Sequence, residues 1–215
     1  MNTRIEKIAG MVKEGVIVAD IGTDHAFLPI LLVKEGKVPK AYACDVSKGP
    51  LEAAAKNIRR EGVKVQTILS DGFQNVPMDT ECAVIAGMGC ITATSILDNA
   101  LDRLGILKQI IVEVNRDTDR MRRWISDHGF TINDEILIQD RGFDYIAIDF
   151  DCRPHSPYSE REILLGPRLL EKNEECFIEY CTRQRQKIEM IMAKCRPDDP
   201  RIEALTKKRD LWSLE

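Results

Sequence analysis

The fold is decided by one stretch of sequence, Val18-Ala19-Asp20-Ile21-Gly22-Thr23-Asp24-His25-Ala26. An apolar run ends there in an acidic residue and a glycine, and a helical pattern follows, which is typical of the turn between a buried strand and a helix. A dinucleotide-binding turn holds three glycines that let a pyrophosphate approach the helix. This turn holds one glycine and two carboxylates. Because carboxylates repel phosphate, it favours a cationic or hydroxyl-bearing ligand.

The alternation of short apolar runs and longer amphipathic runs continues to about residue 150. We expect strands at 16–19, 40–44, 63–68, 82–86 and 109–113. We expect helices at 3–13, 25–35, 48–61, 90–103 and 117–128. Pro50 suits the first turn of one helix, Asp117 the N-cap of another, and His128 a C-terminal cap.

Two further apolar runs, 130–138 and 144–151, follow each other around Asp140-Arg141-Gly142, which is a hairpin pattern. Strands linked by helices form a parallel sheet, and the hairpin should add an antiparallel strand at one edge. The sequence therefore predicts a doubly wound α/β domain over residues 1–152. Ligands of such sheets bind beyond the carboxyl ends of the strands.

Residues 153–215 have a different character and are expected to form a helical domain. Residues 153–157 resemble a stiff linker, and Ser159 to Glu162 fits a capping box. A helix is expected at 168–195, ended by Pro197 and Pro200, with a coiled-coil seam at Leu170, Phe177, Cys181, Gln184, Ile188, Ile191 and Cys195. After Asp199, a short helix carrying Ile202, Leu205 and Trp212 should fold back as an antiparallel hairpin.

The composition sets outer limits on function. The chain has 215 residues, of which 44% are hydrophobic, but no apolar run reaches the roughly 20 residues of a membrane span, and no secretory signal is evident. We expect a soluble cytoplasmic protein. A net charge of −4 excludes a protein that is basic all over. The 7 cysteines contain no CxxC pair, which favours reduced thiols, and no histidine pair has metal-site spacing, so we expect no metal.

Acidic or glycine-bearing turns follow each of the first four predicted strands. Asp45 could accept hydrogen bonds from ribose hydroxyls, and Asp71 could accept from an adenine amino group. Each turn alone is more typical of ordinary turn chemistry, but together they predict a nucleoside site. S-adenosylmethionine fits, because it offers an ammonium, a sulfonium and a ribose without phosphate. The candidate cofactor residues are Asp20, Ile21, Gly22, Asp45, Val46, Asp71, Gly72, Gly87, Met88 and Gly89.

The string Asp-Ile-Gly-Thr-Asp-His-Ala-Phe-Leu-Pro at 20–29, with Ile-Ala-Gly-Met-Gly at 85–89 and the helical tail, resembles the bacterial tRNA adenine-22 N1-methyltransferase family (TrmK-like) over essentially the whole chain. The resemblance implies a Rossmann-like class I methyltransferase domain and a C-terminal coiled-coil domain. It also implies methyl transfer from S-adenosylmethionine to N1 of an adenosine in the tRNA D-arm region. The chain departs from the family at Cys90, usually glycine, and at Glu113-Val114-Asn115, usually Gln-Pro-Asn.

Methyl transfer to N1 of adenine requires no prior deprotonation, because N1 carries an in-plane lone pair. Positioning should dominate. Asp24 could stabilise the positive charge that develops on the base, and His25 or Asn115 could orient the adenine edge. The alternative for Asp24 and His25 is helix capping.

Candidate RNA contacts come from two basic groups of residues, for which the alternative is solvated helix faces balanced by glutamates. They are Arg116, Arg120, Arg122 and Arg123, and, on the tail, Arg183, Arg185, Lys187, Lys194 and Arg196. Two other functions stay open. One is a methyltransferase for a small molecule or protein, with the tail as a dimerisation coiled coil. The other is a cofactor-binding or RNA-binding protein that has lost catalysis. We expect a monomer or a weak homodimer.

Overall fold

The computed structural model describes residues 3–196 and 198–214. The chain divides into two compact units, residues 1–157 and residues 158–215. The linker at 153–157 is hydrogen bonded to the first unit, since His155 donates its backbone N–H to Gly129 O at 2.8 Å and Thr131 Oγ1 donates to Arg153 O at 2.7 Å. Among the described residues, no helix has the length and apolar character needed to cross a membrane.

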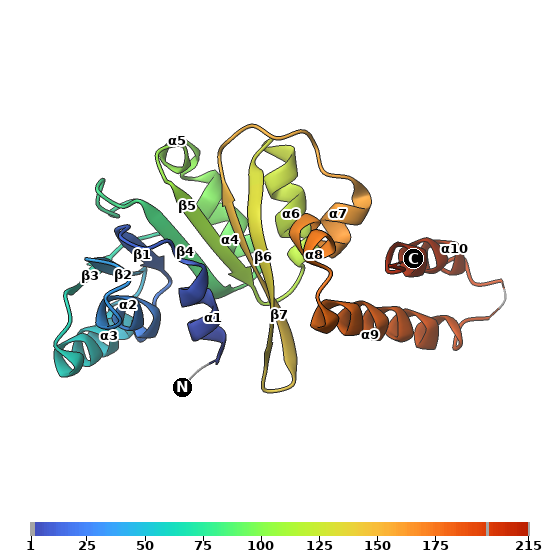
Figure 1. Cartoon of the computed structure of the whole chain (residues 1–215), viewed down its shortest axis with the longest axis horizontal. Coiled ribbons are helices and arrows are strands. Elements are labelled where there is room, and N and C mark those ends of the chain that lie inside the picture. Colours follow the sequence, from blue (N-terminus) through green and yellow to red (C-terminus); the bar gives the residue numbers. More distant parts are fainter. Residues whose placement is uncertain (1–2, 197, 215) are drawn as a thin grey trace. The chain divides into compact units, whose positions relative to one another are not determined.

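The first unit is built on one seven-stranded sheet with the strand order β3-β2-β1-β4-β5-β7-β6 (Figure 1). Its strands are β1 (Val18–Ile21), β2 (Ala41–Asp45), β3 (Val65–Leu69), β4 (Cys82–Met88), β5 (Gln109–Val114), β6 (Thr131–Asp140) and β7 (Phe143–Asp151). The first five strands pair in parallel, and β7 pairs antiparallel with both β5 and β6. The expected hairpin thus supplies the antiparallel part of the sheet, with the reversed strand one place inside the edge.

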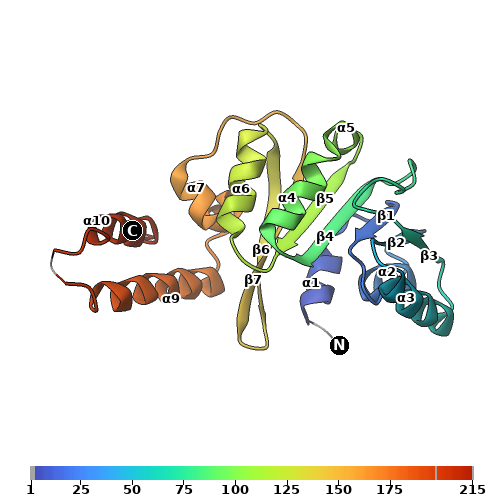
Figure 2. The same ribbon diagram turned by 180° about the vertical axis from the view of Figure 1, so that it is seen from behind.

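Helices cover both faces of the sheet, which confirms the doubly wound α/β fold (Figures 1 and 2). One face carries α1 (Thr3–Met11), α2 (Phe27–Lys34) and α3 (Lys48–Glu61); the other carries α4 (Cys90–Asp98), α5 (Leu101–Leu104) and α6 (Thr118–Asp127). On the first face, Ile8 of α1 packs in one cluster with Leu28 and Leu32 of α2 and the strand residues beneath them. This core holds the strand ends rigidly, because buried side chains are close-packed.

Three expectations about local structure are wrong in detail. The first strand begins at Val18, not Val16, because the backbone of Ile17 is bonded to Glu81 and Cys82 outside the parallel ladder. The helix expected at 90–103 is two helices, since Ala100 leaves the helical conformation at φ −131°. Asp117 does precede α6, but it is left-handed (φ 61°) and its side chain makes no capping hydrogen bond.

The C-terminal unit consists of α7 (Glu160–Leu165), α8 (Pro167–Lys172), α9 (Glu175–Met192) and α10 (Ile202–Leu211). The capping box of Ser159 and Glu162 is confirmed. The continuous helix expected at 168–195 is wrong, because Asn173 adopts a left-handed conformation (φ 46°) that separates α8 from α9. Within the unit, α10 packs against α9, with the Tyr180 and Trp212 rings 5.6 Å apart. Pro197 lies outside the described residues.

Arg122 of α6 and Glu135 of β6 form an ion pair inside the first unit. Their nearest atoms, Nε and Oε1, are 2.6 Å apart, and the two side chains are 1% and 0% exposed. The hydrophobic sequence pattern does not show that these residues are buried. Arg122 is therefore a structural residue, and its assignment as an RNA contact is wrong.

We expect Glu135→Ala to lower the free energy of unfolding by about 3–5 kcal/mol, because it leaves the buried Arg122 guanidinium without its carboxylate partner. Urea denaturation measures the change. Glu61→Ala is the matched control, since Glu61 pairs with Lys34 on the surface, and its loss should cost less than about 1 kcal/mol. Equal effects of the two substitutions would contradict a structural role for the buried pair.

Candidate functional site

A cavity of about 930 Å³ lies at the carboxyl ends of the parallel strands. Seven of the ten candidate cofactor residues line it: Ile21, Gly22, Asp45, Val46, Asp71, Gly72 and Met88. They come from four different strand ends, which lie together because parallel strands all point their carboxyl ends to one edge of the sheet. The cavity is at the upper end of the size range that small-molecule sites occupy.

The turn after β1 lies between the ends of the neighbouring strands, and its residue Gly22 lines the cavity. Gly22 has φ 80°, a conformation that glycine adopts without steric cost, and the backbone N–H groups of Gly22 and Thr23 both donate to Cys44 O at 2.9 Å. Asp24 (φ 52°) and Ala26 (φ 58°) are also left-handed. The N-cap residue of α2 is Ala26, whose methyl side chain cannot accept a hydrogen bond, and neither Asp24 nor His25 occupies that position. The capping alternative is therefore wrong for both residues.

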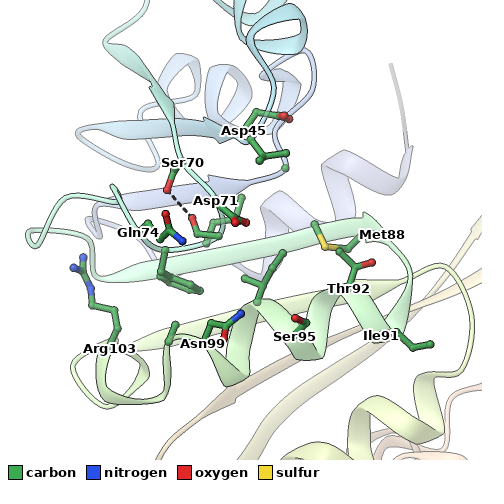
Figure 3. Close-up of a pocket in the computed structure, with 17 residues that line it drawn as sticks. Asp45, Ser70, Asp71, Gln74, Met88, Ile91, Thr92, Ser95, Asn99 and Arg103 are labelled. Atoms are coloured by element: carbon green, nitrogen blue, oxygen red, sulfur yellow. Dashed lines mark hydrogen bonds between the residues drawn. The ribbon is translucent and has the colours of Figure 1, made fainter.

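Asp45 and Asp71 present carboxylates to the cavity from neighbouring strand ends (Figure 3). Asp45 is held by two backbone donors, Ser47 N–H at 2.9 Å on Oδ1 and Asp24 N–H at 3.3 Å on Oδ2. The loop of Asp71 is tied to the same strand end, because Ser70 N–H donates to Asp45 O at 2.9 Å. The ends of β2 and β3 are thus held together, and each offers the cavity a carboxylate that can accept hydrogen bonds from a polar ligand.

One wall of the cavity is formed by residues that the sequence analysis missed. They lie on α4 and α5 and in the loop after β3: Phe73, Gln74, Ile91, Thr92, Ser95, Ile96, Asn99, Ala100 and Arg103. In Figure 3, Ser95 of α4 and Asn99, the residue just after this helix, lie across the cavity from Asp71 and Gln74. The available signal was the spacing of Thr92, Ser95 and Asn99, three and four residues apart, which places polar groups on one face of a helix.

A second cavity, of about 320 Å³, adjoins the first at Gly22, which lines both. It holds the other side of the β1 turn, namely Asp20, Thr23, Asp24 and His25, together with Phe27, Leu28, Ala86 and Gly87. Its remaining lining residues, Arg4, Ile5 and Ile8, come from α1. Two of the three acceptor-side candidates, Asp24 and His25, are therefore brought together here, with His25 Nε2 and Asp24 Oδ2 3.6 Å apart.

Asp20 is the buried carboxyl of this second cavity. The residue is 6% exposed, and Oδ2 accepts a hydrogen bond from Thr23 Oγ1 at 2.6 Å. Burial raises the pKa of Asp20 to about 6; the Thr23 hydrogen bond opposes this rise, while the charge of Asp45 adds to it. The carboxyl is thus ionised at neutral pH at a cost in desolvation, which a cationic ligand group would offset.

Asn115, the third acceptor-side candidate, lines neither cavity but is hydrogen bonded to Gly87, which lines the second one. Its side chain donates from Nδ2 to Gly87 O at 3.1 Å, and its backbone N–H donates to Met88 O at 3.0 Å. Gly87 (φ 81°) lies where the pairing of β4 with β5 shifts register. Asn115 therefore sets the path of the Gly87-Met88-Gly89 segment. Gly89, at the N-cap of α4, is outside both linings.

The RNA candidates occur in both units. Arg116, Arg120 and Arg123 are exposed in the loop after β5 and on α6. On α9, Lys187 and Arg185 are exposed, and Arg183 is half-buried. Arg185 pairs with Glu189 at 3.2 Å and Arg183 with Glu179 at 3.8 Å, so part of the charge on α9 is balanced within the helix, as the alternative interpretation expects. The described residues contain no cluster of three metal-ligating side chains.

The sequence of this chain matches a known protein family and known proteins. The methyltransferase domain family matches residues 1–148. The tRNA (adenine(22)-N(1))-methyltransferase of Bacillus subtilis is 25% identical over 199 residues, which cover 89% of this chain and 84% of that protein.

Two solved structures superimpose on nearly the whole chain. Streptococcus pneumoniae Sp1610 in complex with S-adenosyl-L-methionine has a TM-score of 0.88 at 29% identity, covering 99% of this chain and 97% of that one. M. capricolum TrmK in complex with S-adenosyl-homocysteine has a TM-score of 0.86 at 26% identity, covering 99% and 96%. The chain therefore belongs to the methyltransferases, in the TrmK-like family of tRNA (adenine-22-N1)-methyltransferases.

Proposed function

We propose that the protein is an S-adenosylmethionine-dependent methyltransferase that modifies N1 of adenosine 22 in bacterial tRNA. The observation that carries the proposal is the pair of adjoining cavities at the strand ends, one lined by Asp45 and Asp71 and the other by Asp20 and Asp24. Related proteins bind S-adenosylmethionine or its product, and one of them is a tRNA (adenine(22)-N(1))-methyltransferase.

The larger cavity suits the nucleoside part of the cofactor. Asp45 would accept from the ribose hydroxyls and Asp71 from the adenine amino group, while Val46, which is 65% exposed at the rim, and Ile96 supply apolar contact to the rings. Asp20 would face the cationic end of the cofactor in the smaller cavity. The other cofactor candidates would contact the cofactor through their backbone and let it approach the chain closely. They are Ile21, Gly22, Gly72, Gly87, Met88 and Gly89.

The cofactor supplies an electrophilic methyl group, whose bond to sulfur breaks as the bond to adenine N1 forms, so that the positive charge passes to the base. The protein then has two tasks, to align the base and to stabilise this charge. Asp24, with a side chain 69% exposed at the mouth of the second cavity, is placed to stabilise the cationic base. His25 would contact the adenine edge directly, whereas Asn115 would act through the Gly87 segment.

The relatives and the exposed arginines after β5 support a tRNA acceptor. Arg116, Arg120 and Arg123 would contact phosphates close to the β5 end of the site, and Arg183, Arg185 and Lys187 would contact them from α9. A target base within folded tRNA must also leave its stack before reaction. We propose that the enzyme acts in the cytoplasm, as a monomer or weak homodimer.

Incubation with radiolabelled S-adenosylmethionine and unmodified bacterial tRNA should place label in 1-methyladenosine, identified after nucleoside digestion. We expect Asp71→Ala to weaken cofactor binding by about tenfold or more, because a hydrogen bond to the adenine amino group is lost. Asp24→Ala should retain cofactor affinity but lower turnover. Glu52→Ala, which removes an exposed carboxylate on α3, is the matched control.

Each outcome separates the rival functions. Cofactor binding with no label in tRNA would contradict the tRNA acceptor and favour a small molecule or protein. Binding of tRNA with no methyl transfer to any acceptor would favour a protein that has lost catalysis. Label in another nucleoside would overturn the N1 assignment alone.

We expect the buried carboxyl of Asp20 to lower the stability of the protein while it favours cofactor binding. Its pKa is raised from 3.8 to about 6 in the folded state, so the folded protein binds more protons than the unfolded chain between these pH values, and stability falls as pH rises through them. Asp20→Asn avoids this cost. We expect it to raise the free energy of unfolding by up to about 3 kcal/mol above pH 6, with no gain below pH 4, and to weaken cofactor binding.

Urea denaturation at pH 4, 5, 6 and 8, with cofactor titrations at pH 8, measures both effects. Asp24→Asn is the control, because its side chain is exposed to water, and its stability difference from the native protein should be small at every pH. A gain for Asp20→Asn that is the same at pH 4 and pH 8 would show that burial of the ionised carboxyl is not its cause.

A further inference from the structure

The segment from the end of α2 to the start of β3 is the basic part of an acidic chain. Residues 34–64 hold 8 Lys/Arg and 4 Asp/Glu, whereas the rest of the chain holds 23 Lys/Arg and 31 Asp/Glu. The segment therefore carries a formal charge of +4 and the remainder −8. A local excess of one sign creates a positive potential over this part of the surface, even though the protein as a whole is negative.

The exposed cations of α3 lie on one side of the helix. Lys48, Lys56 and Arg59 fall within about 80° of one another around the helix axis, and all three are exposed. Ile58 points to the other side, where it is buried in a cluster against the sheet. Glu52 is the carboxylate that shares the exposed face. With three cations and one carboxylate, this face of α3 is positively charged.

The cations of the α3 face are not neutralised by the protein itself. Elsewhere in the segment, Glu61 pairs with Lys34 at 2.8 Å and with Arg60 at 3.2 Å. The three cations of the α3 face form no ion pair with any residue that the structure describes. On α9, by contrast, arginines pair with glutamates of the same helix. An anionic partner could therefore bind the α3 face without breaking an ion pair.

The basic face begins at the rim of the larger cavity. Asp45 and Val46 line this cavity, and α3 begins two residues later at Lys48. In the middle of α3, Asn57 donates from Nδ2 to His25 O at 3.0 Å, which ties the helix to the turn of the acceptor-side candidates. The helix extends about 21 Å along the β2–β3 end of the sheet (Figures 1 and 2). The face thus leads from the proposed site along the side of the domain.

An open recess lies beyond the C-terminal end of α3. It has a volume of about 360 Å³ and is lined by Pro39, Lys40, Lys64, Val65 and Gln66. Lys40 pairs with Asp79 at 3.0 Å, whereas Lys64 is exposed and has no ion-pair partner among the described residues. The side chains of Lys64 and Gln66 can both donate hydrogen bonds to a phosphate oxygen. The recess therefore continues the basic face of α3.

We propose that the exposed face of α3, with Lys48, Lys56 and Arg59, and the recess at Lys64 bind the sugar–phosphate backbone of the tRNA outside the target nucleotide. The inference rests on the proposed tRNA acceptor. The ends of β2 and β5 are three strand spacings apart, or about 15 Å, so α3 and the arginines after β5 would hold the RNA on two sides of the β1 and β4 turns. Backbone contacts of this kind position a nucleic acid without reading its sequence.

A matched pair of double variants tests the inference. Lys56→Gln/Arg59→Gln removes two charges from the α3 face, and Lys13→Gln/Lys108→Gln removes two charges from the segments that precede β1 and β5. The two variants have the same net charge. All four side chains are exposed, and glutamine forms helices nearly as well as lysine and arginine, so both variants should fold as the native protein does.

Binding of unmodified tRNA at several salt concentrations measures the effect. We expect Lys56→Gln/Arg59→Gln to weaken tRNA binding about tenfold or more and to reduce the slope of log K against log salt by about 2, one for each lost phosphate contact. Its KM for tRNA should rise by a similar factor, with kcat and the affinity for S-adenosylhomocysteine unchanged within about twofold. Lys64→Gln should reduce the slope by about 1. Lys13→Gln/Lys108→Gln should bind and methylate tRNA as the native protein does.

Three results would overturn the inference. Equal weakening in the two double variants would mean that only the net charge of the protein matters. Unchanged tRNA affinity in Lys56→Gln/Arg59→Gln would place α3 outside the RNA interface. A lower kcat with unchanged KM would give α3 a part in the reaction rather than in RNA binding. Failure of the proposed function looks different, because the native protein itself would then transfer no methyl group to tRNA.

Discussion

The site depends on one constraint, the parallel register that places the end of β1 between two longer neighbouring strands. Ile21, the last residue of β1, pairs with Cys44 of β2 and with Ile85 of β4, and these strands continue to Asp45 and Met88 on either side of the β1 turn. Two backbone N–H groups of the β1 turn then converge on Cys44 O, and the loop after β3 bonds to Asp45 O. The candidate carboxylates are placed by backbone hydrogen bonds between neighbouring strand ends, which explains how short polar turns can hold a ligand rigidly.

Charged groups serve different ends according to what surrounds them. Arg122 and Glu135 form an ion pair in the core, line neither cavity, and join α6 to β6. Asp20 is buried and forms no ion pair with any residue that the structure describes, and it lines a cavity that we assign to a cationic ligand group. Such a residue lowers the stability of the free protein, because the cost of burying its charge is offset only when the ligand is bound. Glu113, at the end of β5, is buried and paired like Glu135, but its partner Arg4 also lines the second cavity.

The division into two units separates the proposed chemistry from part of the proposed RNA contact. Both cavities are lined by residues of the first unit alone, where a hydrophobic cluster packs α1 and α2 on the sheet. The second unit contributes basic residues on α9 that are partly balanced by Glu179 and Glu189. Ion pairs on a helix surface are weak and screened by salt, so they can exchange one partner for a phosphate at little cost.

By itself, the sequence determined the order of strands and helices, the hairpin, and the polar turns after the first four strands, because these depend on local periodicity and turn chemistry. Asp45, Asp71 and Gly22, which the sequence singled out, line the larger cavity, and their part in cofactor binding stays a prediction. The break at Asn173, the split between α4 and α5, the burial of Arg122 and the pairing of Arg4 with Glu113 were decided only by the tertiary structure. The two ion pairs join side chains of separate elements, Arg122 with Glu135 and Arg4 with Glu113, and no local pattern in the chain records which side chain will be the partner.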